Sequence, residues 1–266
     1  MAQFKGIDVS EWQGVIDWDK VKAAGIQFAI IRAGRGQGTP DKQWKRNADE
    51  CTRVGIPFGV YWFSYAYTVE MAKAEARHCI AAIKPYRLSY PVAFDYEYDS
   101  LNTAKKHGVN VTEKLVSDMT RAFCTEIENA GYYALNYSNV DFLSRFIDDA
   151  AERRYGLWIA APDRSSPPRT CQMWQYSWKG KINGINADVD MNISYVDFPA
   201  IINKPTAAPE QPVQPEQPKP WYEADGSWAQ ATMLGLMDGT RPEDKLTRAE
   251  LAAVALRLVK MMKEGA

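Results

Sequence analysis

The sequence predicts an α/β barrel in which eight strands surround one axis and five helices lie outside them. Eight short segments are apolar and rich in β-branched and aromatic residues, as strands buried on both faces should be. Helical segments separate the early strands, whereas residues 163–170 and 178–186, between the last three, are too short and polar for a packed crossover helix. The pattern is typical of a TIM-type barrel whose last three strands have lost their helices. A doubly wound open sheet is the alternative, but no Gly-rich phosphate loop follows the first strand.

Each expected element has a local signal. The strands are expected at residues 5–10, 28–34, 57–66, 91–98, 132–138, 155–162, 171–177 and 187–195. The helices are expected at residues 17–25, 41–55, 69–84, 112–130 and 139–153. In the first helix, Asp17 is suited to cap the N-terminus and Gly25 to end the helix. In the fourth, apolar side chains recur on one helical stripe, at Val116, Met119, Phe123, Ile127 and Ala130.

Composition and charge exclude several classes of function. The chain has 266 residues, of which 46% are hydrophobic, so it can bury one large core. Its net charge of −1, with acids and bases interspersed, predicts neither a nucleic-acid nor a membrane partner. The four cysteines lie far apart without metal-ligand spacing, so we expect reduced thiols, no metal and no cofactor. The start of the chain has no basic segment followed by an apolar one, and we expect no secretory signal.

A Pro-rich segment divides the chain. Residues 204–220 repeat Pro every two or three positions amid Glu and Gln, which predicts a stiff, extended spacer. We therefore expect a large barrel domain over residues 1–203, a linker over 204–220 and a small helical module over 221–266.

Four acidic residues lie where chemistry is expected in such a barrel. Active sites of TIM-type barrels form at the C-terminal ends of the strands. Asp8 ends the first strand, Asp95 and Glu97 end the fourth, and Asp190 lies on the eighth, which closes against the first. Clustered carboxylates raise one another's pKa, and one of them can then stay protonated near neutral pH as a general acid. Cleavage of a glycosidic bond requires such an acid.

Aromatic residues are frequent on the same strands. Trp and Tyr offer flat apolar faces with polar edges that can stack on sugar rings, although half of these side chains could equally fill the barrel core. The candidates for substrate contact are Tyr61, Phe63, Tyr65, Tyr137, Trp158 and Trp174.

Several separate motifs, in order, carry a resemblance to a known family. They are "GIDVSEWQG", "AIIRAG", "GVYWF", "FDYE", "LWIA", "MWQYS" and "VDMN". Across residues 4–198 the chain resembles the glycoside hydrolase family 25 lysozymes. The resemblance implies a (β/α)5(β)3 barrel that cleaves the β-1,4 bond between N-acetylmuramic acid and N-acetylglucosamine in peptidoglycan.

The resemblance also implies roles for individual residues. Glu97 corresponds to the acid of the family's D-x-E motif, and the other family carboxylates correspond to Asp8, Asp95 and Asp190. Asp188 is an alternative to Asp190, which fits the V-D-x-N pattern better. We place Gln175 of "MWQYS" with the substrate-binding residues.

The order of the acids leaves the mechanism open. Side chains two apart on a strand share a face, so Asp95 can hold Glu97 protonated. Three routes remain open: inversion through a water, a covalent route, and attack by the substrate's own 2-acetamido group. We favour the last, because two acids that are only two positions apart on a strand, such as Asp95 and Glu97, do not readily flank a sugar. Asp99 is expected to be solvated or a loop contact and not catalytic, and Tyr96 is expected to face the outer layer.

The tail resembles one S-layer homology repeat through "DGTRPEDKLTRAE". Thr247 and Glu250 have the spacing of a capping box, ahead of an apolar stripe. The resemblance implies binding to secondary cell-wall polymer. Such repeats usually work in threes, so we expect a single copy to form a homo-oligomer or a weak anchor. The alternative is a helical hairpin packed on the barrel.

The combination of an implied cell-wall hydrolase activity and no expected signal peptide indicates a phage endolysin. Such a protein is made in the host cytoplasm and then released to the wall. Export of a bacterial enzyme by a non-classical route is the alternative. The sequence leaves two other functions open. The chain could be a non-catalytic wall-binding protein built on the same barrel, or a chitinase-like hydrolase.

Overall fold

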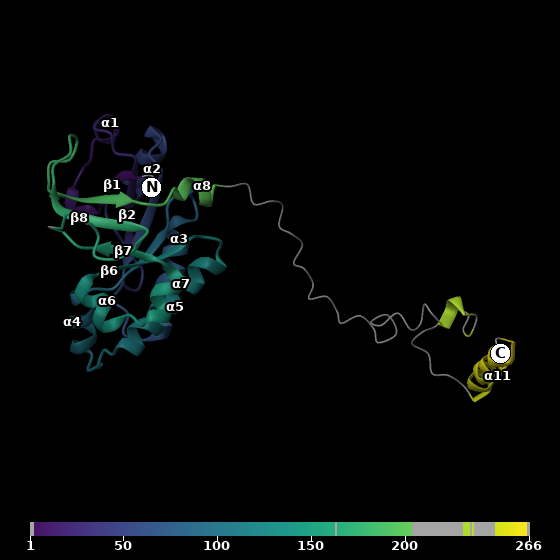
Figure 1. The fold of residues 1–266 in the computed structure, drawn as a ribbon. Helices are drawn as coiled ribbons and strands as arrows, with labels where there is room; N and C mark the ends of the chain where they lie inside the picture. Colours follow the sequence, from purple (N-terminus) through teal and green to yellow (C-terminus); the bar gives the residue numbers. More distant parts are fainter. Residues whose placement is uncertain (1–2, 163, 204–230, 235, 237–247, 265–266) are drawn as a thin grey trace. The chain divides into compact units, whose positions relative to one another are not determined.

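Eight strands close into a ring at the centre of the N-terminal unit (Figure 1). The computed structural model describes residues 3–162, 164–203, 231–234, 236 and 248–264, and it divides the chain into two units, Met1–Lys204 and Pro205–Ala266. The ring consists of β1 (Phe4–Val9), β2 (Phe28–Arg35), β4 (Phe58–Phe63), β5 (Val92–Asp95), β6 (Ala134–Asn139), β7 (Leu157–Ala160), β8 (Met173–Gly180) and β9 (Val189–Ser194). The short β3 (Thr39–Pro40) pairs only with β2. The predicted eight-stranded barrel is confirmed.

The direction of the last strand decides which residues reach the mouth of the barrel. Strands β1, β2 and β4 to β8 run parallel to one another, whereas β9 is antiparallel to both β8 and β1. The beginning of β9 therefore lies beside the end of β1, where Asp190 is paired with Asp8.

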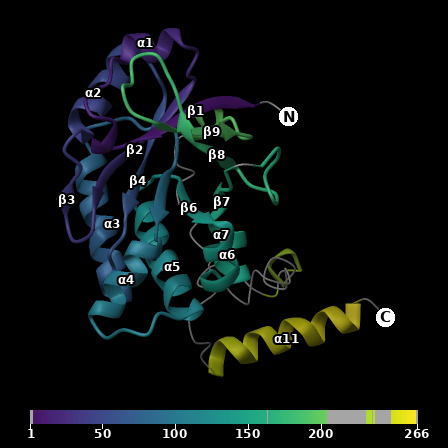
Figure 2. The same cartoon turned by 90° about the vertical axis from the view of Figure 1, so that its left-hand side faces the viewer.

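Helices cover the outer face of the parallel strands (Figures 1 and 2). They are α1 (Trp18–Ala23), α2 (Trp44–Val54), α3 (Val69–Ile83), α5 (Glu113–Asn129), α6 (Val140–Phe146) and α7 (Asp149–Tyr155). In the described part of the barrel unit, only α8 (Phe198–Ile202) follows β7, as the sequence predicts for the last three strands.

Two local predictions differ from the structure. Residues 139–153 form two helices instead of one, because Ile147 is extended and Asp148 caps α7 by accepting a hydrogen bond from Ala151 N. The fourth strand ends at Asp95, and a helix that the sequence did not predict, α4 (Tyr98–Lys106), begins directly after Glu97.

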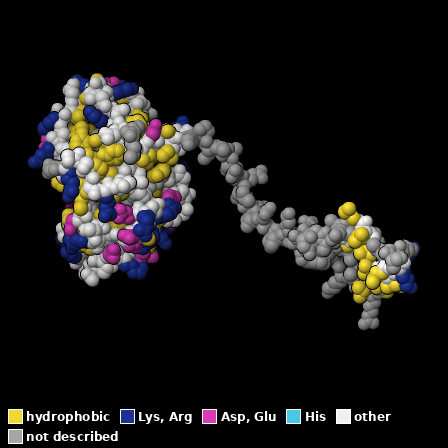
Figure 3. All heavy atoms as spheres, viewed as in Figure 1, with side chains coloured by type: hydrophobic (Ala, Val, Ile, Leu, Met, Phe, Trp, Pro, Cys, Tyr) yellow, Lys and Arg dark blue, Asp and Glu magenta, His cyan; other side chains and the backbone are white. Residues whose placement is uncertain are grey.

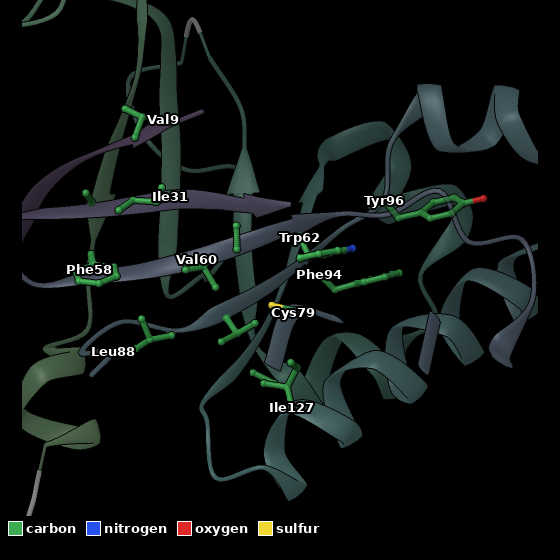
Figure 4. Packing of buried hydrophobic residues seen from close by; sticks show 14 of the residues in the cluster. Val9, Ile31, Phe58, Val60, Trp62, Cys79, Leu88, Phe94, Tyr96 and Ile127 are labelled. Carbon is green, nitrogen blue, oxygen red and sulfur yellow. The ribbon is translucent and has the colours of Figure 1, made fainter. Parts of the chain in front are cut away.

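Two layers of apolar side chains hold the barrel together. The outer layer fills the space between the strands and the helices, and Figure 4 shows part of it, including Trp62 of β4 and Phe94 of β5. The inner layer fills the ring and includes Phe28, Ile30 and Trp158. Where β1 passes the Phe28 ring, a Cβ on Gly6 would lie 2.3 Å from Phe28 Cζ, so only glycine fits.

Three further features concern the cysteines, the surface charge and the length of the helices. All four cysteines are buried and unpaired. On the face of the barrel unit shown in Figure 3, basic and acidic side chains are interspersed. Among the described residues, no helix combines the length and the apolarity that crossing a bilayer would take.

The C-terminal unit contains α11 (Arg248–Glu264). Several of its apolar side chains are exposed: Leu251, Leu256, Leu258, Val259 and Met262. The expected linker over 204–220 and Thr247 of the expected capping box lie outside the described residues.

Candidate active site

Four carboxyl groups from three strands meet at one mouth of the barrel. Asp8 of β1 and Asp190 of β9 are direct cross-strand partners and share a hydrogen bond. Asp95 is the last residue of β5, and Glu97 lies two positions on in extended backbone, so their side chains share a face and a hydrogen bond. The charge of Asp8 raises the pKa of both Asp95 and Glu97, which places the two pairs within electrostatic reach of each other.

Asp8 receives two amide hydrogen bonds on one oxygen. Asn192 Nδ2 donates to Asp8 Oδ2 over 2.7 Å, and Gln175 Nε2 donates to the same atom over 2.8 Å. Gln175 Nε2 also lies 3.5 Å from Asp190 Oδ2. Burial raises the pKa of Asp8 to about 6, and the two amides oppose this rise because they stabilise the ionised form.

The other three acids are also more basic than usual. Burial, followed by the charge of Asp8, raises the pKa of Asp190 to about 8. Burial, followed by the charge of Glu97, raises the pKa of Asp95 well above its ordinary value, and burial raises that of Glu97. Asp95 Oδ1 is buried without a hydrogen-bond partner among the described residues. Each pair can therefore keep a proton near neutral pH.

The start of α4 fixes the position of Glu97. Ser100 Oγ accepts a hydrogen bond from Glu97 N over 3.1 Å and donates to Ser64 O. Ser100 is fully buried, so this link ties the first turn of α4 to the end of β4. Asp99, one residue before it, is exposed, as expected. Tyr96 lies in the outer apolar layer, also as expected.

The structure separates the predicted aromatic residues into three groups. Tyr61, Tyr137 and Trp158 belong to the inner layer, and Trp158 is only 1% exposed, so it offers no free face to a sugar. Phe63 and Tyr65 are partly exposed, with ring centroids 5.1 Å apart. Trp174 is not brought to the mouth: it packs in the outer layer and donates to Ala161 O. Strand alternation explains this, because its neighbour Gln175 faces inward.

Asp188 lies apart from the carboxyl cluster. It precedes β9, is exposed and pairs with Lys181, and its carbonyl oxygen accepts a hydrogen bond from Gln13 Nε2 over 3.0 Å. The structure therefore places Asp190, and not Asp188, beside Asp8.

Sequence reasoning missed three residues that organise the site. Asn192 lies two positions after Asp190, and this spacing, which puts both side chains on one face of a strand, could have identified it. Arg32 is buried and joins Asp41 (Nε–Oδ2, 2.7 Å) to Glu11 (Nη2–Oε1, 2.9 Å), which holds the loop after β1. Trp178 donates to Gln175 Oε1 over 2.9 Å, and no sequence signal pointed to it.

A closed barrel with paired, proton-sharing carboxyl groups at its mouth is the architecture of a glycoside hydrolase. The chain belongs to the glycosyl hydrolases family 25, whose family model matches residues 7–185. The chain is accordingly a glycoside hydrolase of the lysozyme type.

Individual relatives agree with this assignment. Lysozyme M1 of Streptomyces globisporus is 28% identical over 200 residues, which cover 71% of this chain and 66% of that protein. The solved structure of the modular autolysin LytC from Streptococcus pneumoniae is 28% identical, with a TM-score of 0.65, and the match covers 73% of this chain and 47% of LytC. This chain thus spans about half the length of LytC. A family 25 glycosyl hydrolase from Bacillus anthracis shares the fold, with a TM-score of 0.64 at 24% identity.

Proposed function

We propose that this family 25 hydrolase is an N-acetylmuramidase that cleaves the β-1,4 bond between N-acetylmuramic acid and N-acetylglucosamine in peptidoglycan. Support comes from its relatives, which include Lysozyme M1 and an autolytic lysozyme of Clostridium acetobutylicum. LytC, whose barrel it resembles, was solved with a synthetic peptidoglycan ligand.

The observation that carries the proposal is the hydrogen bond shared by Asp95 and Glu97. Two carboxyl groups can share such a bond only if one of them is protonated. Burial and neighbouring negative charges favour this protonated state near neutral pH. The shared bond raises the pKa of Asp95 and lowers that of Glu97, so the proton is held by Asp95 in the free enzyme. Glu97 is the more accessible of the two, so it acts as the general acid that passes this proton to the leaving oxygen.

The same contact argues against a covalent mechanism through Asp95. A nucleophile and an acid that flank a sugar in a retaining enzyme lie about 5–5.5 Å apart, with the substrate between them. Asp95 and Glu97 contact each other and leave no such space. The two carboxyl groups of an inverting enzyme lie farther apart still, about 6.5–9.5 Å, so the paired acids also argue against inversion through a water. We therefore propose that the 2-acetamido group of the substrate attacks the anomeric carbon. Asp8 of β1 and Asp190 of β9, which are cross-strand partners, stabilise the positive charge that develops on the sugar.

Digestion of purified cell walls, followed by mass spectrometry of the soluble fragments, tests the bond specificity. A muramidase leaves N-acetylmuramic acid at the new reducing ends. Fragments that end in reducing N-acetylglucosamine would contradict the proposal. Cleavage of chitin oligomers in preference to peptidoglycan would favour a chitinase-like enzyme, and no cleavage of either would favour a non-catalytic wall-binding protein.

We further propose that the C-terminal module over 221–266 binds secondary cell-wall polymer and self-associates. The resemblance to a single S-layer homology repeat supports the first part, and the exposed apolar side chains of α11 support the second. A muramidase joined to such a module has the domain composition of a phage endolysin, which is the biological role we propose.

A further inference from the structure

Two tryptophan side chains hold the two amides that contact Asp8. Trp158 Nε1 donates to Asn192 Oδ1 over 2.8 Å, and Trp178 Nε1 donates to Gln175 Oε1 over 2.9 Å. The NH2 group of each amide then donates to Asp8 Oδ2. Two indole–amide chains therefore converge on one carboxylate oxygen, one from beneath the site and one from its rim.

An indole determines the orientation of an amide because it can only donate. The oxygen and nitrogen of Gln175 could exchange places by rotation of the terminal amide, and only the surrounding hydrogen bonds select one arrangement. Tyr137 OH also donates to Gln175 Oε1, over 3.0 Å, but a hydroxyl can equally accept and would tolerate the reversed amide. Trp178 cannot accept, so reversal would set an indole N–H against an NH2 group and the amide oxygen against Asp8.

A bulge in β8 directs Trp178 toward Gln175. Strict alternation from Gln175, which faces inward, would turn Trp178 outward. Gln175 is paired with Asn192 but Ser177 with Met191, so one extra residue on β8 is opposed to β9. A second register shift follows between Ser177 and Gly180, so the regular alternation is lost around Trp178, whose indole N–H reaches Gln175. Trp178 remains 52% exposed, so its ring contributes little to the core.

We propose that Trp178 is a positioning residue of the active site: by fixing the Gln175 amide, it keeps two hydrogen bonds on Asp8 and so directs the proton shared by Asp8 and Asp190 to Asp190. The kinetic consequences of this inference rest on the proposed function. Its structural consequence, the ionisation of Asp8, does not.

Several charged or titratable groups face Asp8 and are unchanged by substitution of Trp178. They are Asp190 of β9, Asp95 at the end of β5, Glu97 just after it, Tyr61 of β4 and Tyr137 of β6. Arg32 of β2 lies within electrostatic reach of two of these groups, Tyr61 and Asp95. Burial raises the pKa of Asp8; the hydrogen bonds with Asp190 and the backbone lower it, and so do those of the two amide donors, Asn192 and Gln175. A reversed Gln175 would remove one of these two donors, which should raise the pKa of Asp8 further.

Trp178→Phe tests the inference, because it keeps an aromatic ring and removes the N–H. In carbon-13 NMR titrations of the Asp carboxyl groups, the pKa of Asp8 should rise by about one pH unit. With peptidoglycan fragments, kcat should fall about tenfold, the value of one hydrogen bond to a charged group, with little change in KM. The acidic limb of the kcat profile should move to higher pH. Trp12→Phe is the matched control: Trp12 is 74% exposed and should leave the titration of Asp8 unchanged.

A double-substitution cycle separates positioning from direct substrate contact. If Trp178 acts through Gln175, then Trp178→Phe should change kcat less than twofold in a Gln175→Ala background. Equal effects in both backgrounds, or an unchanged Asp8 titration with a raised KM, would overturn the proposal and leave Trp178 as a sugar contact. A wild-type protein that cleaves no peptidoglycan would refute the proposed function alone, because the NMR titration needs no catalysis.

Discussion

Asn192 on β9 donates a 2.7 Å hydrogen bond to Asp8 on β1, from a position 184 residues later in the chain. The bond crosses the line along which the barrel closes, where Gly6 is paired with Asn192 and Asp8 with Asp190. The ionisation of Asp8 therefore depends on the completed ring: until β9 is in place, Asp8 has neither its acidic partner nor this amide donor. Catalysis and closure of the barrel are coupled through one pair of strands.

Replacement of Glu97 by Gln should abolish most of the activity without harming the fold. The change preserves the shape of the side chain but removes the proton that the leaving oxygen needs, so the rate should fall at least ~100-fold. Thermal stability should be retained or improved, because burial and the charges of Asp8 and Asp99 disfavour an ionised carboxyl group at this position and Gln carries no charge. The rate is measured on purified cell walls and the stability by thermal unfolding.

Asp99→Asn is the control for this substitution, because Asp99 is an exposed acid two residues further on. Its activity should stay within about twofold of wild type, since exposed surface changes rarely perturb a site. A folded Glu97→Gln protein that lyses cell walls as fast as the control would exclude Glu97 as the general acid.

Replacement of Glu75 by Gln should stabilise the barrel at alkaline pH. Glu75 of α3 is fully buried; its Oε1 accepts from Tyr65 N (3.1 Å) and Gln37 Nε2 (3.1 Å), whereas Oε2 has no partner among the described residues. Burial raises its pKa from 4.5 to about 7. A carboxyl group with a raised pKa favours folding below its unfolded value, near pH 4.5, and this contribution is lost as the pH rises through 7.

Glu75→Gln cannot ionise, so its melting temperature should exceed that of wild type by about 3 °C at pH 8 and differ little at pH 5. Glu70→Gln, at an exposed position of the same helix, should show no such pH dependence. An equal shift at both pH values would mean that Glu75 is not the group whose titration weakens the fold.

A chain that ends after Asn203 should retain the chemistry. All four carboxyl groups lie before this point, and α8 remains, with Phe198 packed on Tyr90 at a centroid distance of 5.4 Å. Hydrolysis of soluble peptidoglycan fragments should match that of the full chain, whereas clearing of intact cells should slow, because local concentration at the wall is lost. A shortened protein that is folded yet inert on soluble fragments would show that the C-terminal unit contributes to the site.

The full chain should self-associate through its C-terminal module. Leu251, Leu256, Leu258, Val259 and Met262 are exposed on α11, and contact between copies would remove such apolar surface from water. Light scattering should give a mass above that of one chain at tens of micromolar, and the chain ended after Asn203 should remain monomeric. A monomeric full chain would refute self-association.

The sequence by itself determined the barrel and the meeting of its acids. Apolar segments define the eight strands because strands buried on both faces need apolar side chains throughout. The C-terminal ends of parallel strands lie at the same mouth of a barrel. Asp8 and Asp95 both end such strands, so the order of strands and helices brings them together. Alternation likewise placed Tyr96 outward and Glu97 beside Asp95.

Only the tertiary structure decided the features that depend on pairing between distant segments. The reversal of β9 brings Asp190 to the mouth, and no local pattern specifies strand direction. The bulge in β8 turns Trp178 toward Gln175, whereas regular alternation would have turned it away. The end of β5 and the start of α4 depend on the bond between Ser100 and Ser64, 36 residues apart. In each case a long-range contact overrides the local periodicity, because the free energy of closing the ring and of pairing buried polar groups exceeds local conformational preference.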